Sequence, residues 1–577
     1  MDELLDRRDT GGWTGNGSGY TVITDPSVHQ KWKNIMKLNH AGLMDLNSWK
    51  EAGIMLPSYD VEKVTEKTQS APQWVHFGIG NIFRVFIGGI VDGLLEQGIM
   101  DRGLTCVETF DYEVVDKIYN PFDNLVLSVI LKNDGTRENK VLGSLAEAIK
   151  ADFTDAPSVK RLREIFAADS LQMVSFTVTE KGYALKDAGG KWYASVWNDM
   201  EEGPEKCVTL IGIVTAMLLV RFQNGKKPIA LVSMDNCAHN GELLRQSVLT
   251  MAQVWLERKK VAEEFVDYLK NEEIVAFPWT MIDKITPRPS QIIADELEKL
   301  GLEEMRPVIT GKRTYIAPFA NAEKAQYLVI EDHFPNGRPH LEKGFGVYMT
   351  DRETVIKAER MKVTACLNPV HSALGPIGVV LGIDLFADLL DQEKLRKLAR
   401  NVAYGEGLPM VEDPGIISPE GFTDELFTDR FPNRYLGDTN LRLCTDITQG
   451  VGVRFGETIK AVVRKEGTAK RLSAIPVGIA GLMRYMMEVD DQGNVFELAP
   501  DPLAKELHEQ LSTVKWGHPE TFTDQLRSVL SNTNIFFINL YDAGIGKKIE
   551  DIFREMIAGK GSCEKTVKKY VEQMKDI

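Results

Sequence analysis

Between about residues 73 and 290, short apolar runs alternate with longer runs of helical length. The short runs are WVHF (74–77), LTCVETF (104–110), LQMVSFTV (171–178) and PIALVSMD (228–235), and the helix-length runs cover 82–97 and 207–222. A strand that is followed by a helix and a further strand needs a crossover connection, and repeated crossovers produce a parallel sheet. The alternation therefore predicts an α/β fold for this part of the chain.

The rest of the chain differs from this pattern at both ends. Residues 1–40 are polar and contain the glycine-rich GGWTGNGSGY, which predicts a loosely held extension. Three prolines interrupt the alternation at 277–289, a strand-like YLVIED follows at 327–332, and helical periodicity dominates from about Thr354. We therefore expect an α/β domain over 41–350 and a mainly helical domain over 351–577. A cleft between two such domains is a common place for ligands.

Charge and cysteine usage narrow the possible partners. The 577 residues carry a formal net charge of −15, which argues against nucleic acid and anionic membranes. The six cysteines contain no CxxC pair, a usage typical of reduced thiols in a cytoplasmic protein. No apolar run approaches the length of a membrane span. The expected partner is a small molecule, for a monomer or a small homo-oligomer.

The segment WVHFGIGNIF looks like a dinucleotide-binding turn with one glycine missing. Residues Phe77, Gly78, Ile79, Gly80 and Asn81 connect a strand to a helix, as a pyrophosphate-binding turn does. Position 83, where the fingerprint has its third glycine, carries Phe83, which implies a wider or rotated helix. On the residues alone, a pyrophosphate turn and a plain tight turn are both open.

Two acidic residues follow the second strand. Glu108 and Asp111 stand where a carboxylate accepts the ribose hydroxyls and repels a 2′-phosphate, which favours NAD over NADP. The alternative is a solvated acidic loop.

Several further stretches, in order along the chain, resemble the long-chain polyol dehydrogenases, that is, the mannitol dehydrogenase family, which also includes the fructuronate and tagaturonate reductases. They are LNSWKEAGIMLPSYD (46–60), TVTEKGY (177–183), SMDNCAHNG (233–241), MIDKITP (281–287), VIEDHFPNGRP (329–339), ERMKVTACLNPVHSALGPIG (359–378) and DTNLRLCTD (438–446). The resemblance implies a Rossmann-like NAD-binding domain, a helical substrate domain and metal-independent hydride transfer to a secondary alcohol carbon.

The resemblance also assigns roles to individual residues. Lys362 is the implied general acid/base, Asn236 and Asn368 the oxyanion donors, His371 a substrate contact, Glu359 the gate of a proton path, Asp283 and Arg442 further substrate-site groups, and Glu180 a cofactor contact. The chemistry suits these residue types, because amide donors stabilise a developing oxyanion and burial can lower the pKa of a lysine towards neutrality. The nine histidines are scattered and form no metal-binding motif.

Each of these residues also has an ordinary structural interpretation. A lysine on a helix is usually solvated, an asparagine before a helix often caps it, and an arginine usually forms a salt bridge. Only the combination of motifs outweighs these interpretations.

Two further departures from the family pattern matter. Lys362 and Asn368 are six residues apart, whereas the family spaces them five apart. One inserted residue turns a regular helix by about 100°, so the two side chains could no longer face one carbonyl. A π-bulge or a kink at Pro369 would restore the geometry; otherwise Val363 takes the place of the lysine. The second departure is Gly450, which stands where the family often has a lysine.

The expected activity is NAD-dependent interconversion of a 2-keto hexose-type sugar acid and its alcohol, either fructuronate/mannonate or tagaturonate/altronate. The open alternatives are a mannitol or other neutral polyol 2-dehydrogenase and a catalytically silent NAD-binding protein.

Overall fold

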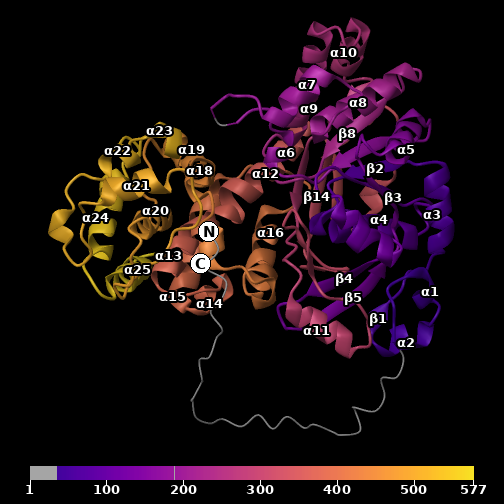
Figure 1. Cartoon of the computed structure of the whole chain (residues 1–577). Helices are drawn as coiled ribbons and strands as arrows, with labels where there is room; N and C mark the ends of the chain where they lie inside the picture. The colour runs from indigo at the N-terminus through magenta and orange to yellow at the C-terminus, as the bar shows by residue number, and fades with distance from the viewer. Residues whose placement is uncertain (1–34, 188) are drawn as a thin grey trace.

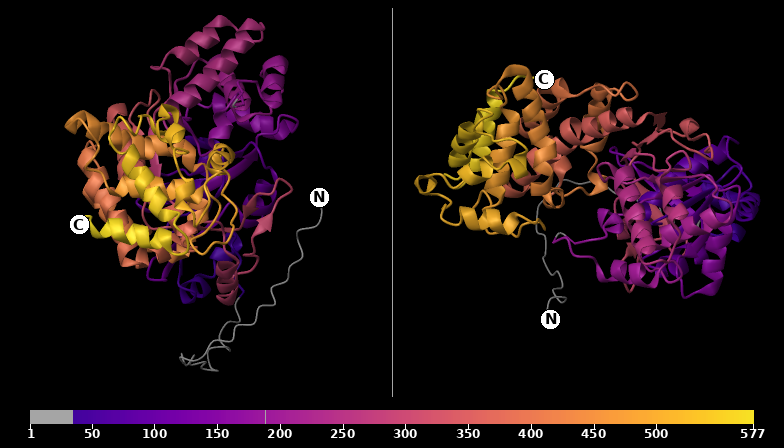
Figure 2. Two further views of the ribbon diagram at one scale, coloured as in Figure 1. Left: turned by 90° about the vertical axis from the view of Figure 1, so that its left-hand side faces the viewer. Right: turned by 90° about the horizontal axis from the view of Figure 1, so that it is seen from above.

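The computed structural model describes residues 35–187 and 189–577. Strands and helices alternate up to β15 (Val347–Thr350), and helices follow from α12 (Arg352–Arg360) onwards. Figure 1 shows these two parts side by side, with α12 and α16 (Pro419–Glu425) between them, and Figure 2 shows the same division from two other directions.

A six-stranded parallel sheet forms the centre of the α/β part, in the order β6-β3-β2-β7-β8-β9. Its strands are β2 (Trp74–Phe77), β3 (Leu104–Glu108), β6 (Leu145–Lys150), β7 (Met173–Phe176), β8 (Ile229–Ser233) and β9 (Val275–Ala276). The four strands β2, β3, β7 and β8 are buried along their whole length, as expected of strands with helices on both faces. The predicted α/β fold with a parallel sheet is confirmed.

Helices cover this sheet on both faces (Figure 1). They include α3 (Val61–Ser70), α4 (Gly88–Glu96), α5 (Ala156–Ala167), α8 (Leu210–Gln223), α9 (Asn240–Glu257) and α10 (Glu263–Lys270). The helix expected at 207–222 begins three residues later, because the Thr209 side chain caps it by accepting from the Gly212 N–H.

Three smaller sheets among the described residues were not expected from the sequence: a two-stranded pair of β11 (Val308–Ile309) with β12 (Tyr315–Ile316), and two larger sheets. One has the order β1-β5-β4-β13, with β1 (Ile54–Met55), β4 (Val126–Leu131), β5 (Arg137–Leu142) and β13 (Phe319–Ala322). The other joins β10 (Thr280–Asp283), β14 (Tyr327–Glu331) and β15, and β14 falls within the predicted 327–332 strand. Both sheets pair segments that are far apart in sequence, which local periodicity cannot indicate.

The N-terminal extension is only partly described. Residues 1–34 lie outside the described residues. For 35–40 the prediction of a loose segment is wrong, because Met36 and Leu38 are buried and the Met36 N–H donates to the Gly301 carbonyl at 2.8 Å. Apolar side chains in this short stretch anchor it to the domain.

The helical part is built around α13 (Asn368–Val380) and α20 (Ala474–Tyr485). These helices approach closely at Gly478 and Gly481, where an added Cβ would lie 2.7 Å from the Ala373 Cβ and 2.5 Å from Ile377 Cγ1. Further helices include α14 (Phe386–Asp391), α15 (Glu393–Arg400), α18 (Ile447–Val451), α19 (Glu457–Glu466), α24 (Gly546–Met556) and α25 (Ser562–Glu572).

One long helical run has the composition of a membrane span. The run Arg352–Val380 is 29 residues long with a mean hydropathy of 1.3 in its most apolar window, of which 72% is buried inside the protein. No run of this length and composition was expected from the sequence, where no apolar stretch approaches the length of a membrane span. Its burial against the other helices is that of a core helix.

Candidate active site

The turn after β2 has the backbone geometry that its glycines predict. Gly78 has φ +89°, and an added Cβ would lie 2.3 Å from the Thr177 carbonyl oxygen. Gly80 has open space around the position of its missing Cβ. The Tyr119 hydroxyl donates to the Ile79 carbonyl at 2.7 Å and holds the turn. The structure therefore requires glycine at Gly78 for conformation, whereas Gly80 keeps the backbone accessible.

The packing of Phe83 shows how the turn accommodates a large side chain in place of the third glycine. It begins a π-helical segment, η2 (Phe83–Ile87), which continues directly into α4. The Phe83 ring is fully buried and stacks on His76 in β2, with 4.1 Å between ring centroids. Strand and helix are thus held apart by a pair of rings, which agrees with the predicted wider or rotated helix.

The predicted cofactor-contact residues differ in how accessible they are. Glu108, at the end of β3, is buried, and its Oε1 accepts the backbone N–H groups of Thr109, Phe110 and Asp111 at 2.8–3.1 Å. The Asp111 carboxylate accepts from the Thr310 hydroxyl at 2.6 Å, so it is already engaged. Phe77 and Ile79 are fully buried and can offer a ligand only backbone atoms.

The remaining two predicted cofactor contacts lie at the edge of this region. Asn81 accepts from Arg84 at 3.4 Å, and Glu180 is exposed at the start of α6 (Glu180–Tyr183), just beyond β7.

A buried lysine lies against the carboxyl end of β8, where parallel sheets usually bind ligands. The Lys362 ammonium donates to Asn236 Oδ1 at 2.8 Å and to the Ile282 carbonyl at 2.6 Å, and it lies 3.5 Å from Asp283 Oδ1. Burial lowers the pKa of Lys362; Asp283 opposes this effect and Arg430 adds to it. Asn236 uses its oxygen here, which leaves its amide hydrogens to donate elsewhere.

A π-helix absorbs the extra residue between Lys362 and Asn368. The segment η6 (Met361–Cys366) is π-helical, and the Leu367 N–H donates to the Lys362 carbonyl, five residues earlier, at 3.2 Å. The inserted residue is thus absorbed by a π-helical segment, the first of the two predicted possibilities. Lys362, and not Val363, lies in the polar cluster. Asn368 begins α13 half-buried, and its side chain forms no hydrogen bond to another described residue.

A buried arginine that the sequence analysis did not identify completes this cluster. Arg430 ends η9 (Leu426–Arg430) and donates to both Asp283 oxygens, at 2.8 and 3.0 Å, and to Glu323 at 2.7 Å. Burial alone would raise the pKa of Asp283, but Arg430 and Lys362 hold it below its usual value. The sequence carries no signal for this pairing, because FTDRF reads as an ordinary amphipathic helix end.

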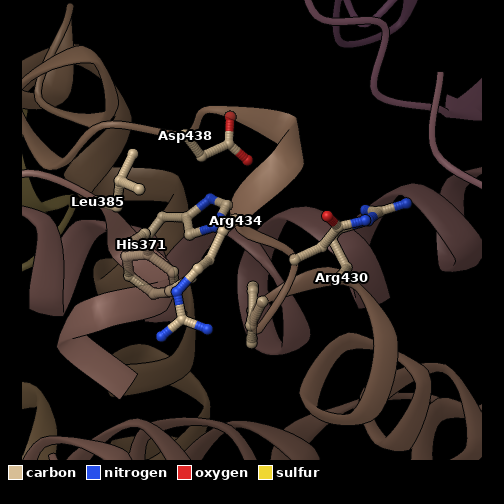
Figure 3. A pocket seen from close by; sticks show the side chains of 9 residues that line it. His371, Leu385, Arg430, Arg434 and Asp438 are labelled. Atoms are coloured by element: carbon tan, nitrogen blue, oxygen red, sulfur yellow. The ribbon is translucent and has the colours of Figure 1, made fainter. Parts of the chain in front are cut away.

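His371 and Arg442 lie at the edge of the same region. The His371 ring packs between Phe386 and Phe431, at centroid distances of 4.8 and 5.2 Å. Figure 3 shows it beside a small cavity, with Arg430 and Asp438 also labelled. Arg442 pairs with Asp438 and lines a separate cavity of about 1000 Å³.

The predicted gate residue lies near the lysine on the same helical run. Glu359 is half-buried in the last turn of α12, and one of its carboxylate oxygens accepts the His239 N–H at 3.4 Å. Burial raises the pKa of Glu359, against opposing effects of His239 and Lys362.

Comparison with known proteins decides the family. Residues 72–343 match the mannitol dehydrogenase Rossmann domain, and residues 355–556 match the mannitol dehydrogenase C-terminal domain. The chain belongs to the mannitol dehydrogenase family. It is accordingly an NAD-dependent oxidoreductase that acts on CH–OH groups.

Individual relatives of this mannitol dehydrogenase family member cover between 80% and 93% of its length. A D-mannonate oxidoreductase of Thermotoga maritima is 47% identical over 93% of this chain and 99% of its own. A polyol:NADP oxidoreductase of Gluconobacter oxydans is 28% identical over 80% of this chain and 88% of its own. The Pseudomonas fluorescens mannitol 2-dehydrogenase, solved with NAD and D-mannitol, shares the fold. It is 23% identical, with a TM-score of 0.68, over 93% of this chain and 99% of its own.

The two glycines of the turn give a test of cofactor binding in this family member. We expect Gly80→Ala to weaken NADH binding at least tenfold without changing thermal stability, because its methyl group would stand where a phosphate approaches. Gly78→Ala is the matched comparison, and it should lower stability by about 1–3 kcal/mol through its strained φ. Fluorescence titration with NADH and thermal melting measure the two effects. Unchanged NADH affinity in Gly80→Ala would contradict a pyrophosphate contact at this turn.

Proposed function

We propose that this enzyme interconverts a six-carbon keto sugar acid and the corresponding alcohol, with fructuronate/mannonate ahead of tagaturonate/altronate as the substrate pair. The similarity to a D-mannonate oxidoreductase over almost the full length supports a sugar acid as substrate. The observation that carries the proposed chemistry is the Lys362–Asn236 hydrogen bond beside the end of β8.

In this proposal Lys362 is the general acid/base. When bound, the nicotinamide exchanges a hydride with the substrate carbon. In the reducing direction the protonated Lys362 amine donates a proton to the oxygen, and in the oxidising direction the neutral amine accepts it. The lowered pKa of Lys362 favours both exchanges near neutral pH.

Two asparagines stabilise the charge that develops on the substrate oxygen. Asn236 accepts from Lys362 through its oxygen, so its amide N–H groups are oriented away from the lysine and can donate. The Asn368 side chain, at the start of α13, forms no hydrogen bond within the described residues, so its amide can donate as well. Amide donors held in place before the reaction stabilise an oxyanion without reorganisation, so the proposed reaction requires no metal ion.

Three further roles complete the proposal. His371 and Arg442 contact the substrate. Asp283 orients Lys362, and Arg430 in turn holds Asp283 in place. Glu359 passes protons between Lys362 and solvent, since its carboxyl is half-buried and its raised pKa allows it to carry a proton. Glu108 selects NAD over NADP, while Asp111 is the weaker candidate because Thr310 engages it.

Two alternative functions, a neutral polyol 2-dehydrogenase and a silent NAD-binding protein, are compared with this proposal. A neutral polyol 2-dehydrogenase is supported by the fold shared with mannitol 2-dehydrogenase. A silent NAD-binding protein requires Lys362 to point away from the other polar groups, which the 2.8 Å contact with Asn236 argues against. For the cellular setting we propose the cytoplasm, which suits six cysteines that are all free thiols.

A substrate panel tests the proposal. Fructuronate, tagaturonate and fructose are each offered with NADH and with NADPH, and cofactor oxidation is followed at 340 nm. We expect at least a hundredfold higher kcat/KM for one of the two keto acids than for fructose, with NADH preferred. Preference for fructose would establish the polyol alternative, and equal use of NADPH would contradict the role of Glu108.

A further inference from the structure

Arg454 is a half-buried arginine beside the candidate site, and none of the roles proposed above involves it. It lies in the π-helical segment η11 (Gly452–Gly456), and π-helical segments also carry Lys362 and Arg430. Its Nη1 donates to the Ser372 hydroxyl at 2.8 Å, and Ser372 directly follows His371 on α13. Arg454 therefore lies on the substrate-domain side of the cluster.

Arg454 has no acidic partner among the described residues, because its only hydrogen-bond acceptor there is Ser372. Arg430, by contrast, is paired with both Asp283 and Glu323. Withdrawing part of a guanidinium from water is costly, so a partly buried arginine is normally paired with an acid. The absence of an acidic partner among the described residues leaves this guanidinium open to an anionic ligand.

Two nitrogens of this guanidinium remain available to a ligand. Neither Nε nor Nη2 of Arg454 donates to a described residue, and neither is among the buried side-chain nitrogens that solvent cannot reach. Nε–H and Nη2–H lie along one edge of the guanidinium and point in the same direction. This edge matches the two oxygens of a carboxylate.

The position of the Arg454 guanidinium also explains why residue 450 is a glycine. A Cβ added at Gly450 would lie 2.6 Å from Arg454 Nε and 2.7 Å from Cζ. Side chains on a helix lean towards its N-terminus, so Arg454 reaches back over the residue four positions earlier. The absence of a side chain at Gly450 thus leaves room for a cation from the following turn.

The surroundings of His371 favour an anion. Burial is the largest effect that lowers the pKa of His371 to about 3, and the positive charges of Arg430, Arg454 and Arg442 contribute to the same shift. Of these three arginines, Arg430 and Arg442 have carboxylate partners within the protein. Arg454 contributes the unbalanced positive charge.

We propose that Arg454 binds the carboxylate of the sugar-acid substrate through its Nε–H and Nη2–H edge, next to His371, and thereby selects acids over neutral polyols. This inference rests on the proposed sugar-acid function. The carboxylate is remote from the reacting carbonyl and keeps its charge throughout the reaction. Arg454 should therefore contribute equally to ground-state and transition-state binding, and its loss should raise KM more than it lowers kcat.

The test compares Arg454→Met with Arg464→Met, an exposed arginine on α19 without an acidic partner among the described residues. With NADH and the preferred keto acid, we expect Arg454→Met to raise KM about 100-fold, the loss of a charge-assisted pair, with kcat within a few-fold of wild type. Arg464→Met should match wild type. NADH affinity and melting temperature should be unchanged in both variants.

A second variant keeps the test decisive if Arg454→Met fails to fold. Arg454→Lys retains the charge without the two-nitrogen edge, so it should show a smaller rise in KM, about tenfold. An unchanged KM for the acid in a folded Arg454 variant would overturn this proposal and leave the proposed function intact. If the wild-type enzyme reduces no sugar acid at all, the proposed function fails and the carboxylate site fails with it.

Discussion

Replacing Lys362 with methionine should lower kcat/KM for the keto acid by about 10³-fold, which is within the range of a lost general acid/base. Methionine fills a similar volume, so the buried position keeps its packing while the transferable proton is lost. NADH binding should persist, since Lys362 contacts Asn236, the Ile282 carbonyl and Asp283 and none of the residues of the glycine turn. The measurements are steady-state kinetics and fluorescence titration with NADH.

The pH profile gives this prediction a second readout. Burial lowers the pKa of Lys362, so the neutral amine needed for alcohol oxidation should form below the usual pH range of a lysine. The kcat/KM for oxidation should rise with pH through that pKa, and the kcat/KM for reduction should fall. Lys362→Met should lack this titration in both directions.

Lys357→Met is the matched control. Lys357 lies on the same helical run, where it pairs with Glu353 and Glu412 near the surface. Such pairs are worth at most about 1 kcal/mol, so activity and its pH dependence should stay close to wild type. A Lys362→Met enzyme with wild-type turnover would show that another group transfers the proton, and the mechanism proposed above would then be wrong.

The second large effect is expected on stability. Arg430→Met should lower the free energy of unfolding by about 3–5 kcal/mol, because it leaves Asp283 and Glu323 buried without their shared cation. Arg430 belongs to the helical part, whereas Asp283 and Glu323 follow or end strands of the α/β part. The substitution should therefore loosen the contact between the two parts as well as the site. Thermal melting and urea unfolding measure the loss.

Arg434→Met provides the comparison for this variant. Arg434 also pairs with two carboxylates, Asp388 and Asp391, but all three side chains are about half exposed. Its loss should cost at most about 1 kcal/mol. In Arg430→Met, a further Glu323→Gln change should recover part of the lost stability by removing one of the two stranded charges. Equal melting temperatures for Arg430→Met and Arg434→Met would refute a stabilising role for the buried cluster.

The parts of the site that lie in contiguous motifs could be predicted from the sequence. The glycine turn, the lysine and the asparagine each stand in a short segment whose neighbours identify it. The inserted residue before Asn368 was also visible, and the two ways of absorbing it followed from helix geometry. Which of the two occurs depends on how η6 packs against the rest of the helical part, so only the structure could show the π-helix.

Other features were outside the reach of sequence reasoning. The β4–β5 hairpin and the strand β13 pair segments that lie up to nearly 200 residues apart. The Thr310 hydroxyl, 199 residues away in sequence, donates a hydrogen bond to the Asp111 carboxylate. A carboxylate in the expected position is therefore already engaged within the protein. No local pattern distinguishes a free acidic side chain from one that a distant hydroxyl has bound.

The sequence by itself determined the alternation of strands and helices, the turn that requires Gly78 and the family to which the chain belongs. These properties depend on periodicity, on single-residue backbone preferences and on contiguous motifs. The tertiary structure decided which charges meet. It placed Arg430 between Asp283 and Glu323, brought Lys362 to Asn236, and left Arg454 near His371 without an acidic partner in the described part of the chain. The physical reason is that the pairing and the pKa of a buried charge depend on groups that only the packing of distant segments brings within a few ångströms.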